Sequence, residues 1–241
     1  YDINTLWITM NKLKIIDLFC GSGGFTLGFL KEKFEVQLAI DHDPYCEQVY
    51  KKNLPNTNFI LQNLSQINKK IFLGLKPDVV VGGPPCQGFS TIGSRISSIE
   101  KKREKKDIRN NLVFSFIEHV NYLNPKIFLM ENVSGILTRD KGEIFHELTK
   151  KIKKFGYKYE VFKLDAVNYG VPQFRKRVFI IGTKDEKYKI SKPNITHGEN
   201  FLLEEEIKIN SVIKDLAKIK IDESINHVPL KHKPTNLKRY R

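Results

Sequence analysis

The 241-residue chain contains few of the residues that build disulfide frameworks, metal centres or membrane spans. Its 3 cysteines, Cys20, Cys46 and Cys86, form no CxxC pair, so we expect neither a disulfide framework nor a metal site. No apolar run approaches the roughly 18 residues that a membrane-spanning helix needs. The first residues also lack the basic, apolar and small-residue segments of a secretory signal. We therefore expect a cytoplasmic protein with no membrane partner.

Acidic residues are few relative to basic ones. The sequence has 27 Asp and Glu against 41 Lys and Arg, which gives a net charge of +14. Such an excess favours a polyanionic partner, and nucleic acid is the first candidate. A compositional bias of the genome towards lysine is an equally good explanation of the charge. The charge alone therefore identifies no function.

Short apolar runs alternate with amphipathic stretches along most of the chain. The runs expected to be buried strands are KIIDLF at 14–19, VQLAID at 36–41, DVVVGG at 78–83, KIFLMEN at 126–132 and RVFIIG at 177–182. Helical spacing of apolar residues follows the first run and recurs over 45–54, 112–123 and 144–155, and a further short helix is expected from Glu204 towards Leu216. This alternation predicts an α/β sheet with helices on both faces.

The pattern also divides the chain. Residues 1–9 precede Met10 and are expected to be an extension, and residues 10–190 are expected to form one main domain. Within it, the highly charged segment 94–109 lacks an apolar stripe and is predicted to be an exposed loop. The pattern weakens over residues 191–241, which we expect to begin a separate, incomplete region.

A glycine cluster, Gly21, Gly23 and Gly24, lies in the sequence DLFCGSGG between the first expected strand and its helix. Ligand atoms can approach such backbone closely, and Asp41 at the end of the next strand can accept hydrogen bonds from ribose hydroxyls. Thr26 stands where the third glycine of a phosphate-binding G-x-G-x-x-G turn would be, so an adenosine without pyrophosphate fits better than a dinucleotide. The alternative is an ordinary strand-to-helix turn with a solvated Asp41.

The sequence GGPPCQGFS at 82–90 follows a buried strand and places Cys86 where open α/β sheets bind their ligands. Pro84 and Pro85 stiffen the approach to this thiol. A single cysteine is more often a small buried apolar residue, but in this setting we interpret Cys86 as a nucleophile that nearby cations keep ionised.

Together the motifs resemble those of the cytosine-C5 DNA methyltransferase family. They are DLFCGSGG, GGPPCQGFS, the triplet Glu131-Asn132-Val133 and the run Gln173-Phe174-Arg175-Lys176-Arg177, in the family's order and at roughly its intervals. The resemblance covers about residues 14–182. It implies a Rossmann-like, S-adenosylmethionine-dependent methyltransferase sheet, double-stranded DNA as substrate, and a bacterial restriction-modification system, in the cytoplasm or at the nucleoid.

The resemblance also implies catalytic roles. Cys86 resembles the thiolate that adds to cytosine C6, and Glu131 resembles the carboxyl group that holds cytosine N3. Arg175 and Arg177, two positions apart before a strand, are expected to share one face and to orient the base and the thiolate. A carboxylate at a helix N-terminus and arginines on phosphates are the simpler alternatives. Asn132 and Gln173 are expected to support loops.

The expected cofactor is S-adenosyl-L-methionine, with S-adenosyl-L-homocysteine as product. The family positions that would hold it correspond to Phe19, Gly21, Ser22, Gly24, Asp41, His42, Asn63 and Pro85. Asn63 departs from the family, which commonly has Asp there, and its amide oxygen is expected to accept one hydrogen bond from the adenine. Segment 94–109 is the expected lid over a flipped-out base, although a solvated charge run is the commoner outcome.

The family's target-recognition region and C-terminal motifs have no counterpart in the sequence. A split enzyme with a second polypeptide, a truncated form and a fragment all fit this observation. Two other functions stay open, a tRNA cytosine-C5 methyltransferase and an inactive methyltransferase that serves as a binding module.

Overall fold

The computed structural model describes residues 12–85, 110–200 and 202–220. The strands are β1 Lys14–Leu18, β2 Glu35–Asp41, β3 Phe59–Leu61, β4 Val79–Gly82, β5 Ile127–Asn132, β6 Lys158–Asp165 and β7 Lys176–Thr183. The α-helices are α2 Gly24–Lys31, α3 Pro44–Asn53, α5 Asn110–Leu123, α6 Glu143–Lys154 and α7 Ile209–Ile213. Short 3₁₀ helices are η1 Lys69–Phe72, η3 Ser134–Leu137, η4 Arg139–Gly142, η5 Ala166–Tyr169 and η6 Lys214–Lys218.

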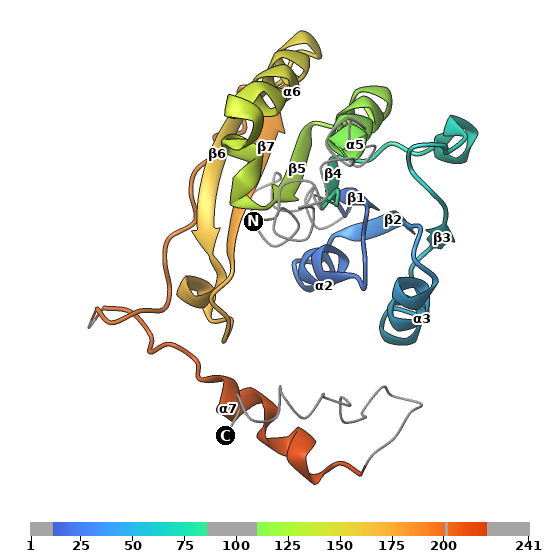
Figure 1. Cartoon of the computed structure of the whole chain (residues 1–241). Helices are drawn as coiled ribbons and strands as arrows, with labels where there is room; N and C mark the ends of the chain where they lie inside the picture. The colour runs from blue at the N-terminus through green and yellow to red at the C-terminus, as the bar shows by residue number, and fades with distance from the viewer. Residues whose placement is uncertain (1–11, 86–109, 201, 221–241) are drawn as a thin grey trace, which may run out of the picture. The chain divides into compact units, whose positions relative to one another are not determined.

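The strands form one 7-stranded sheet in the order β3-β2-β1-β4-β5-β7-β6 (Figure 1). Strands β1 to β5 run parallel to one another, and β7 pairs antiparallel with both β5 and β6. The strand order reverses between β1 and β4, and open α/β sheets bind ligands beyond the carboxyl ends of the strands at such a point. Because β7 is antiparallel, its first residues lie at this same edge.

Helices cover both faces of the sheet, as the alternation of apolar runs predicts (Figure 1). On one face the fully buried residues Leu18, Met130 and Ile180 pack with Phe116 of α5 and Leu148 of α6 in the main core. On the other face Ile15, Val79 and Val81 pack against Phe25 and Phe29 of α2, while Tyr50 of α3 packs with Cys20, Ala39 and Phe59. The period-two alternation of β1 therefore places Ile15 and Asp17 on the α2 and α3 side.

The predicted sheet with helices on both faces is confirmed, and each expected strand is present within one residue of its predicted bounds. Two strands were not expected from apolar runs. Strand β3 has only 3 residues, and β6 is an edge strand whose sequence KYEVFKLD has no continuous apolar run. The helix expected from Glu204 is wrong in its start, because α7 begins at Ile209 and Glu204 instead forms a β-bridge with His197.

The chain divides into two compact units, Tyr1–Asp165 with Lys176–Asn194, and Ala166–Arg175 with Ile195–Arg241. The first unit holds the whole sheet. The second joins the loop between β6 and β7 to the segment that carries α7. No helix in the part of the chain that the structure describes is long and apolar enough to cross a membrane.

Candidate cofactor and catalytic site

The turn between β1 and α2 adopts a backbone that most side chains avoid. Phe19, Gly21 and Gly23 have φ angles of 59°, 53° and 95°. A Cβ added at Gly21 or Gly24 would meet no atom within 4 Å, whereas one at Gly23 would lie 2.7 Å from Leu54 Cδ1. The turn is therefore packed against α3 on its inner side and open on its outer side. A positive φ at Phe19, which is not a glycine, is the kind of strain that is common at ligand sites.

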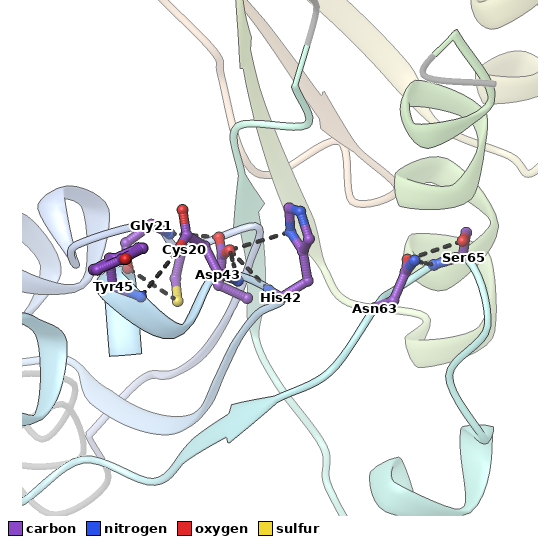
Figure 2. Close-up of polar contacts among 8 residues, drawn as sticks. Cys20, Gly21, His42, Asp43, Tyr45, Asn63 and Ser65 are labelled. Atoms are coloured by element: carbon purple, nitrogen blue, oxygen red, sulfur yellow. Dashed lines mark hydrogen bonds and ion pairs between the residues drawn. The ribbon is translucent and has the colours of Figure 1, made fainter. Parts of the chain in front are cut away.

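Asp41, at the end of β2, ties this turn to the neighbouring strand. Its Oδ2 accepts a hydrogen bond from the Gly21 amide at 2.8 Å, and its Oδ1 accepts from the amides of His42 at 2.7 Å and Asp43 at 3.0 Å (Figure 2). The side chain is only 11% exposed. The first role of this carboxylate is thus to fix the two loops, which leaves the second lone pair of Oδ2 for a ligand hydroxyl.

The rim around the turn is accessible. Ser22, Gly24, His42 and Asn63 are exposed, and Gly21 and Phe19 are half-buried. The His42 ring lies 3.4 Å from Asp41 Oδ1. These positions include most of those expected for the cofactor, and β1, β2 and β3 bring them to one edge of the sheet.

Asn63 differs from the expectation that its amide oxygen is available to adenine. The oxygen accepts hydrogen bonds from both the amide of Ser65 at 3.0 Å and its hydroxyl at 2.8 Å (Figure 2). A carbonyl oxygen has two lone pairs, so this turn uses its full accepting capacity. The amide nitrogen of Asn63, a donor, is the group left for a ligand.

Pro84 and Pro85 follow β4 at the same edge and lead to Cys86, which itself lies outside the described residues. Asn132, at the end of β5, is 2% exposed and donates from Nδ2 to the Pro84 carbonyl at 3.3 Å. Its Oδ1 accepts from the Val133 amide at 2.9 Å. The predicted loop-supporting role of Asn132 thus has a direct structural counterpart.

Glu131 and Arg177 form an ion pair, with Arg177 Nε 2.7 Å from Glu131 Oε1. The two side chains are 21% and 23% exposed, so the pair is shielded but still reachable. The pairing of β5 with β7 places them, because Glu131 faces Phe179 in the register and Arg177 lies just before Val178. A Cβ at Gly83 would be 3.4 Å from Glu131 Oε2, which puts this carboxylate beside the loop that leads to Cys86.

Of the two expected arginines, Arg177 makes the ion pair with Glu131 described above. Arg175 precedes β7 and belongs to the second unit, where its carbonyl accepts from the Ala166 amide at 3.1 Å. Strand β7 begins between the two arginines, at Lys176. The common face of the two arginines stays a prediction. Segment 94–109, the expected lid, lies outside the described residues.

Several supporting residues were missed by reasoning from the sequence. Asp17 is fully buried below the turn, and burial raises its pKa from 3.8 to about 7. Thr26 and Tyr50 join it in a chain of hydrogen bonds. In the second unit, Thr196 and His197 donate from their amides to the Asn168 carbonyl, and the His197 ring packs on Gly170. These partners lie far apart in the sequence, so no local pattern could reveal them.

Comparisons with known proteins identify the family. The family model for C-5 cytosine-specific DNA methylase matches residues 13–240. The chain is 39% identical to Type II methyltransferase M.AgeI of Thalassovita gelatinovora over 77% of this chain and 42% of that protein. It is 38% identical to M.AquIA of Picosynechococcus sp. over 77% of both chains. A crystal structure described as a prophage-encoded DNA modification methyltransferase of E. coli superposes with a TM-score of 0.67 at 29% identity, covering 84% of this chain and 54% of that one.

The chain spans about half the length of the first curated relatives it matches, with coverages of 42%, 50% and 50%. The sheet is that of the Rossmann-like, S-adenosylmethionine-dependent methyltransferases. Given the match over residues 13–240, the chain belongs to the C-5 cytosine-specific DNA methylase family.

Proposed function

We propose that this chain is the catalytic part of a DNA (cytosine-5-)-methyltransferase of a Type II restriction-modification system. The observation that carries the proposal is the Glu131–Arg177 pair beside Gly83, at the sheet edge where the sequence runs into Cys86. An acid, a cation and a thiol are the groups that addition to cytosine requires. Family membership and relatives named Type II methyltransferases support the same assignment.

The glycine turn between β1 and α2, together with Asp41, fits S-adenosyl-L-methionine. The open outer side of the glycine turn leaves room for the methionine portion of the cofactor to lie close to the backbone of Gly21 and Gly24. Asp41 retains one acceptor for the ribose, while Phe19, Ser22, His42, Asn63 and Pro85 complete the proposed set. The chemistry supplied there is an electrophilic methyl group.

Cytosine C5 is a weak nucleophile, and the proposed role of the protein is to strengthen it. The Cys86 thiolate adds to C6, and the displaced electron density reaches N3 and O2 of the ring. Glu131 takes up a proton for this step on Oε2 and donates it to N3, while Arg177 orients the carboxyl group through Oε1 and Arg175 contacts the base oxygen. After C5 gains the methyl group, loss of the C5 proton and of the thiolate restores the ring. The base must leave the duplex for this, which costs a few kcal/mol.

Target recognition is the part of the proposal that needs a partner. The first curated relatives extend well beyond the matched region, whereas M.AquIA is covered over 77% of its length and is thus a curated relative of similar size. We propose that a second polypeptide, or a further part of the same protein, supplies the recognition region. Double-stranded DNA is the proposed substrate.

The test is transfer of a labelled methyl group from S-adenosyl-L-methionine to unmethylated DNA and, in parallel, to tRNA. The chain is assayed alone and mixed with the product of the adjoining reading frame. Cys86→Ser is the loss variant, and Cys46→Ser, on α3, is the matched control. Transfer to DNA that Cys86→Ser abolishes and Cys46→Ser keeps supports the proposal. Transfer to tRNA alone supports a tRNA methyltransferase, and no transfer in any mixture contradicts an active enzyme.

The covalent step has its own test. DNA with 5-fluorocytosine at the target should give a complex that survives denaturation, because fluorine cannot leave C5 as the proton does. Glu131→Gln should slow formation of this complex, since it loses the proton for N3. A methylated product without any trapped complex would contradict the adduct while leaving the methyltransferase assignment in place.

A further inference from the structure

Below the glycine turn, a buried chain of hydrogen bonds joins three elements of the first unit. The Tyr50 hydroxyl of α3 donates to Thr26 Oγ1 at 3.0 Å, and Thr26 Oγ1 donates to Asp17 Oδ2 of β1 at 2.7 Å. The Thr26 amide of α2 donates to the same oxygen at 3.1 Å. All three side chains are 0% exposed. The chain thus fixes the start of α2 relative to β1 and α3.

Tyr50 also supports the turn by direct packing. A Cβ at Gly23 would lie 3.0 Å from both Cδ2 and Cε2 of the Tyr50 ring, so backbone and ring are already in close contact. Gly23 precedes α2 as its N-cap, with a left-handed φ of 95° and no side-chain cap. Asp17, which lies in β1, takes the place of the missing side-chain cap because it accepts a hydrogen bond from the Thr26 amide. One tyrosine therefore contacts the turn by packing and by hydrogen bonding.

The arrangement is costly for stability. Asp17 Oδ1 is buried with no hydrogen-bond partner in the part of the chain that the structure describes. A buried carboxylate with an unsatisfied oxygen destabilises a fold, and apolar packing at such a place is often as stable or better. In return, the two hydrogen bonds from Thr26 to the Asp17 carboxylate fix the position of Thr26, and with it the position of the residues that begin α2.

We infer that Tyr50, Thr26 and Asp17 are positioning residues that hold the glycine turn in the conformation that binds the cofactor. The inference rests on the proposed binding of S-adenosyl-L-methionine at this turn. The residues act through the backbone of Gly21 to Gly24, because their own side chains are buried. A loss of the Tyr50 hydroxyl therefore weakens binding without removing any group that a ligand can touch.

The test is calorimetric titration of the chain with S-adenosyl-L-homocysteine, which needs neither DNA nor turnover. Tyr50→Phe and Thr26→Val each remove one hydroxyl with little change of shape. Tyr50→Phe loses its hydrogen bond to Thr26 and should weaken binding by roughly 5- to 10-fold, whereas Thr26→Val loses the bonds to both Tyr50 and Asp17 and should weaken binding by at least as much. Thr26→Ser keeps the hydroxyl and should bind within about 2-fold of the wild type. Urea unfolding of each variant checks that it is folded at the titration temperature.

Each outcome decides the inference. Weaker binding by folded Thr26→Val, restored in Thr26→Ser, supports it. Wild-type affinity in both hydroxyl-deleting variants overturns it and leaves the proposed function intact, because it would show that the chain of bonds serves stability alone. If the wild-type chain does not bind S-adenosyl-L-homocysteine, the proposed cofactor site fails, and the inference with it.

Discussion

Asn63 stands where the resemblance to the family leads us to expect Asp. Its amide oxygen is taken by Ser65 and its amide nitrogen can only donate. In Asn63→Asp, one carboxylate oxygen keeps the turn with Ser65 and the other becomes free to accept from the adenine amino group. We expect S-adenosyl-L-homocysteine to bind about 3- to 10-fold more tightly, as one added hydrogen bond would allow.

The measurement is the same calorimetric titration, with Asn63→Ala as control. The alanine loses both the turn and the polar group, so its binding should be weaker than that of the wild type. Weaker binding by Asn63→Asp as well would show that the donor nitrogen of Asn63, rather than an acceptor, faces the ligand.

The stability of the protein should depend on pH through Asp17, because burial raises the pKa of this residue from 3.8 to about 7 in the folded protein. Between these values the folded state holds a proton that the unfolded state has lost. The contribution of this group to stability is therefore complete below pH 3.8 and is lost as the pH rises through about 7. The difference across this range is at most about 4 kcal/mol.

Asp17→Asn carries no such titration, and its carbonyl oxygen still accepts from Thr26. From pH 5 to pH 8, the free energy of unfolding of Asp17→Asn should rise relative to the wild type by about 1 to 3 kcal/mol, measured by urea denaturation. Other carboxylates, such as Asp78 with its lowered pKa, titrate in both proteins and cancel in the difference. Parallel pH profiles of the two proteins would contradict the raised pKa of Asp17.

At the scale of elements, the contact of β1 with β4 leaves no room for a side chain at Gly82. A Cβ there would lie 2.2 Å from the Leu18 carbonyl oxygen and 2.7 Å from Phe116 Cε2. Backbone of the neighbouring strand cannot rotate away, so Gly82→Ala should lower the free energy of unfolding by about 3 kcal/mol. The matched change Gly28→Ala in α2 meets no atom within 4 Å and should raise stability by up to about 1 kcal/mol.

Urea denaturation of the two alanine variants tests this pair. A Gly82→Ala protein as stable as the wild type would mean that β1 and β4 can separate without cost. That result would remove the explanation for the glycine at the end of β4.

The elements that the sequence predicts well are those with a strong local pattern. Strands β1, β4, β5 and β7 are runs of adjacent apolar residues, and α6 has clear helical spacing. Strand β6 was missed because an edge strand is half solvated, and α7 was placed too early because Glu204 pairs with His197 instead. The motifs singled out Glu131 and Arg177, which the structure joins in an ion pair, but the Tyr50–Thr26–Asp17 chain depends on tertiary contacts across 9 and 24 positions.

At the scale of the whole molecule, the charge of +14 has two explanations that make different predictions. If the basic residues contact phosphates, binding to duplex DNA must weaken steeply with salt, because each contact releases condensed counterions. With about 4 such contacts, the affinity should fall roughly 100-fold between 50 and 200 mM NaCl. If the lysines only reflect the composition of the genome, little binding is expected at either salt concentration.

Fluorescence anisotropy with a labelled duplex of arbitrary sequence makes the measurement. A second duplex of unrelated sequence should bind equally well, because phosphate contacts carry no sequence information and the region proposed to recognise the target lies elsewhere. Binding that is strong but insensitive to salt would contradict the electrostatic explanation. Binding that distinguishes the two duplexes would show that this chain itself reads bases, and the proposed need for a separate recognition region would then be wrong.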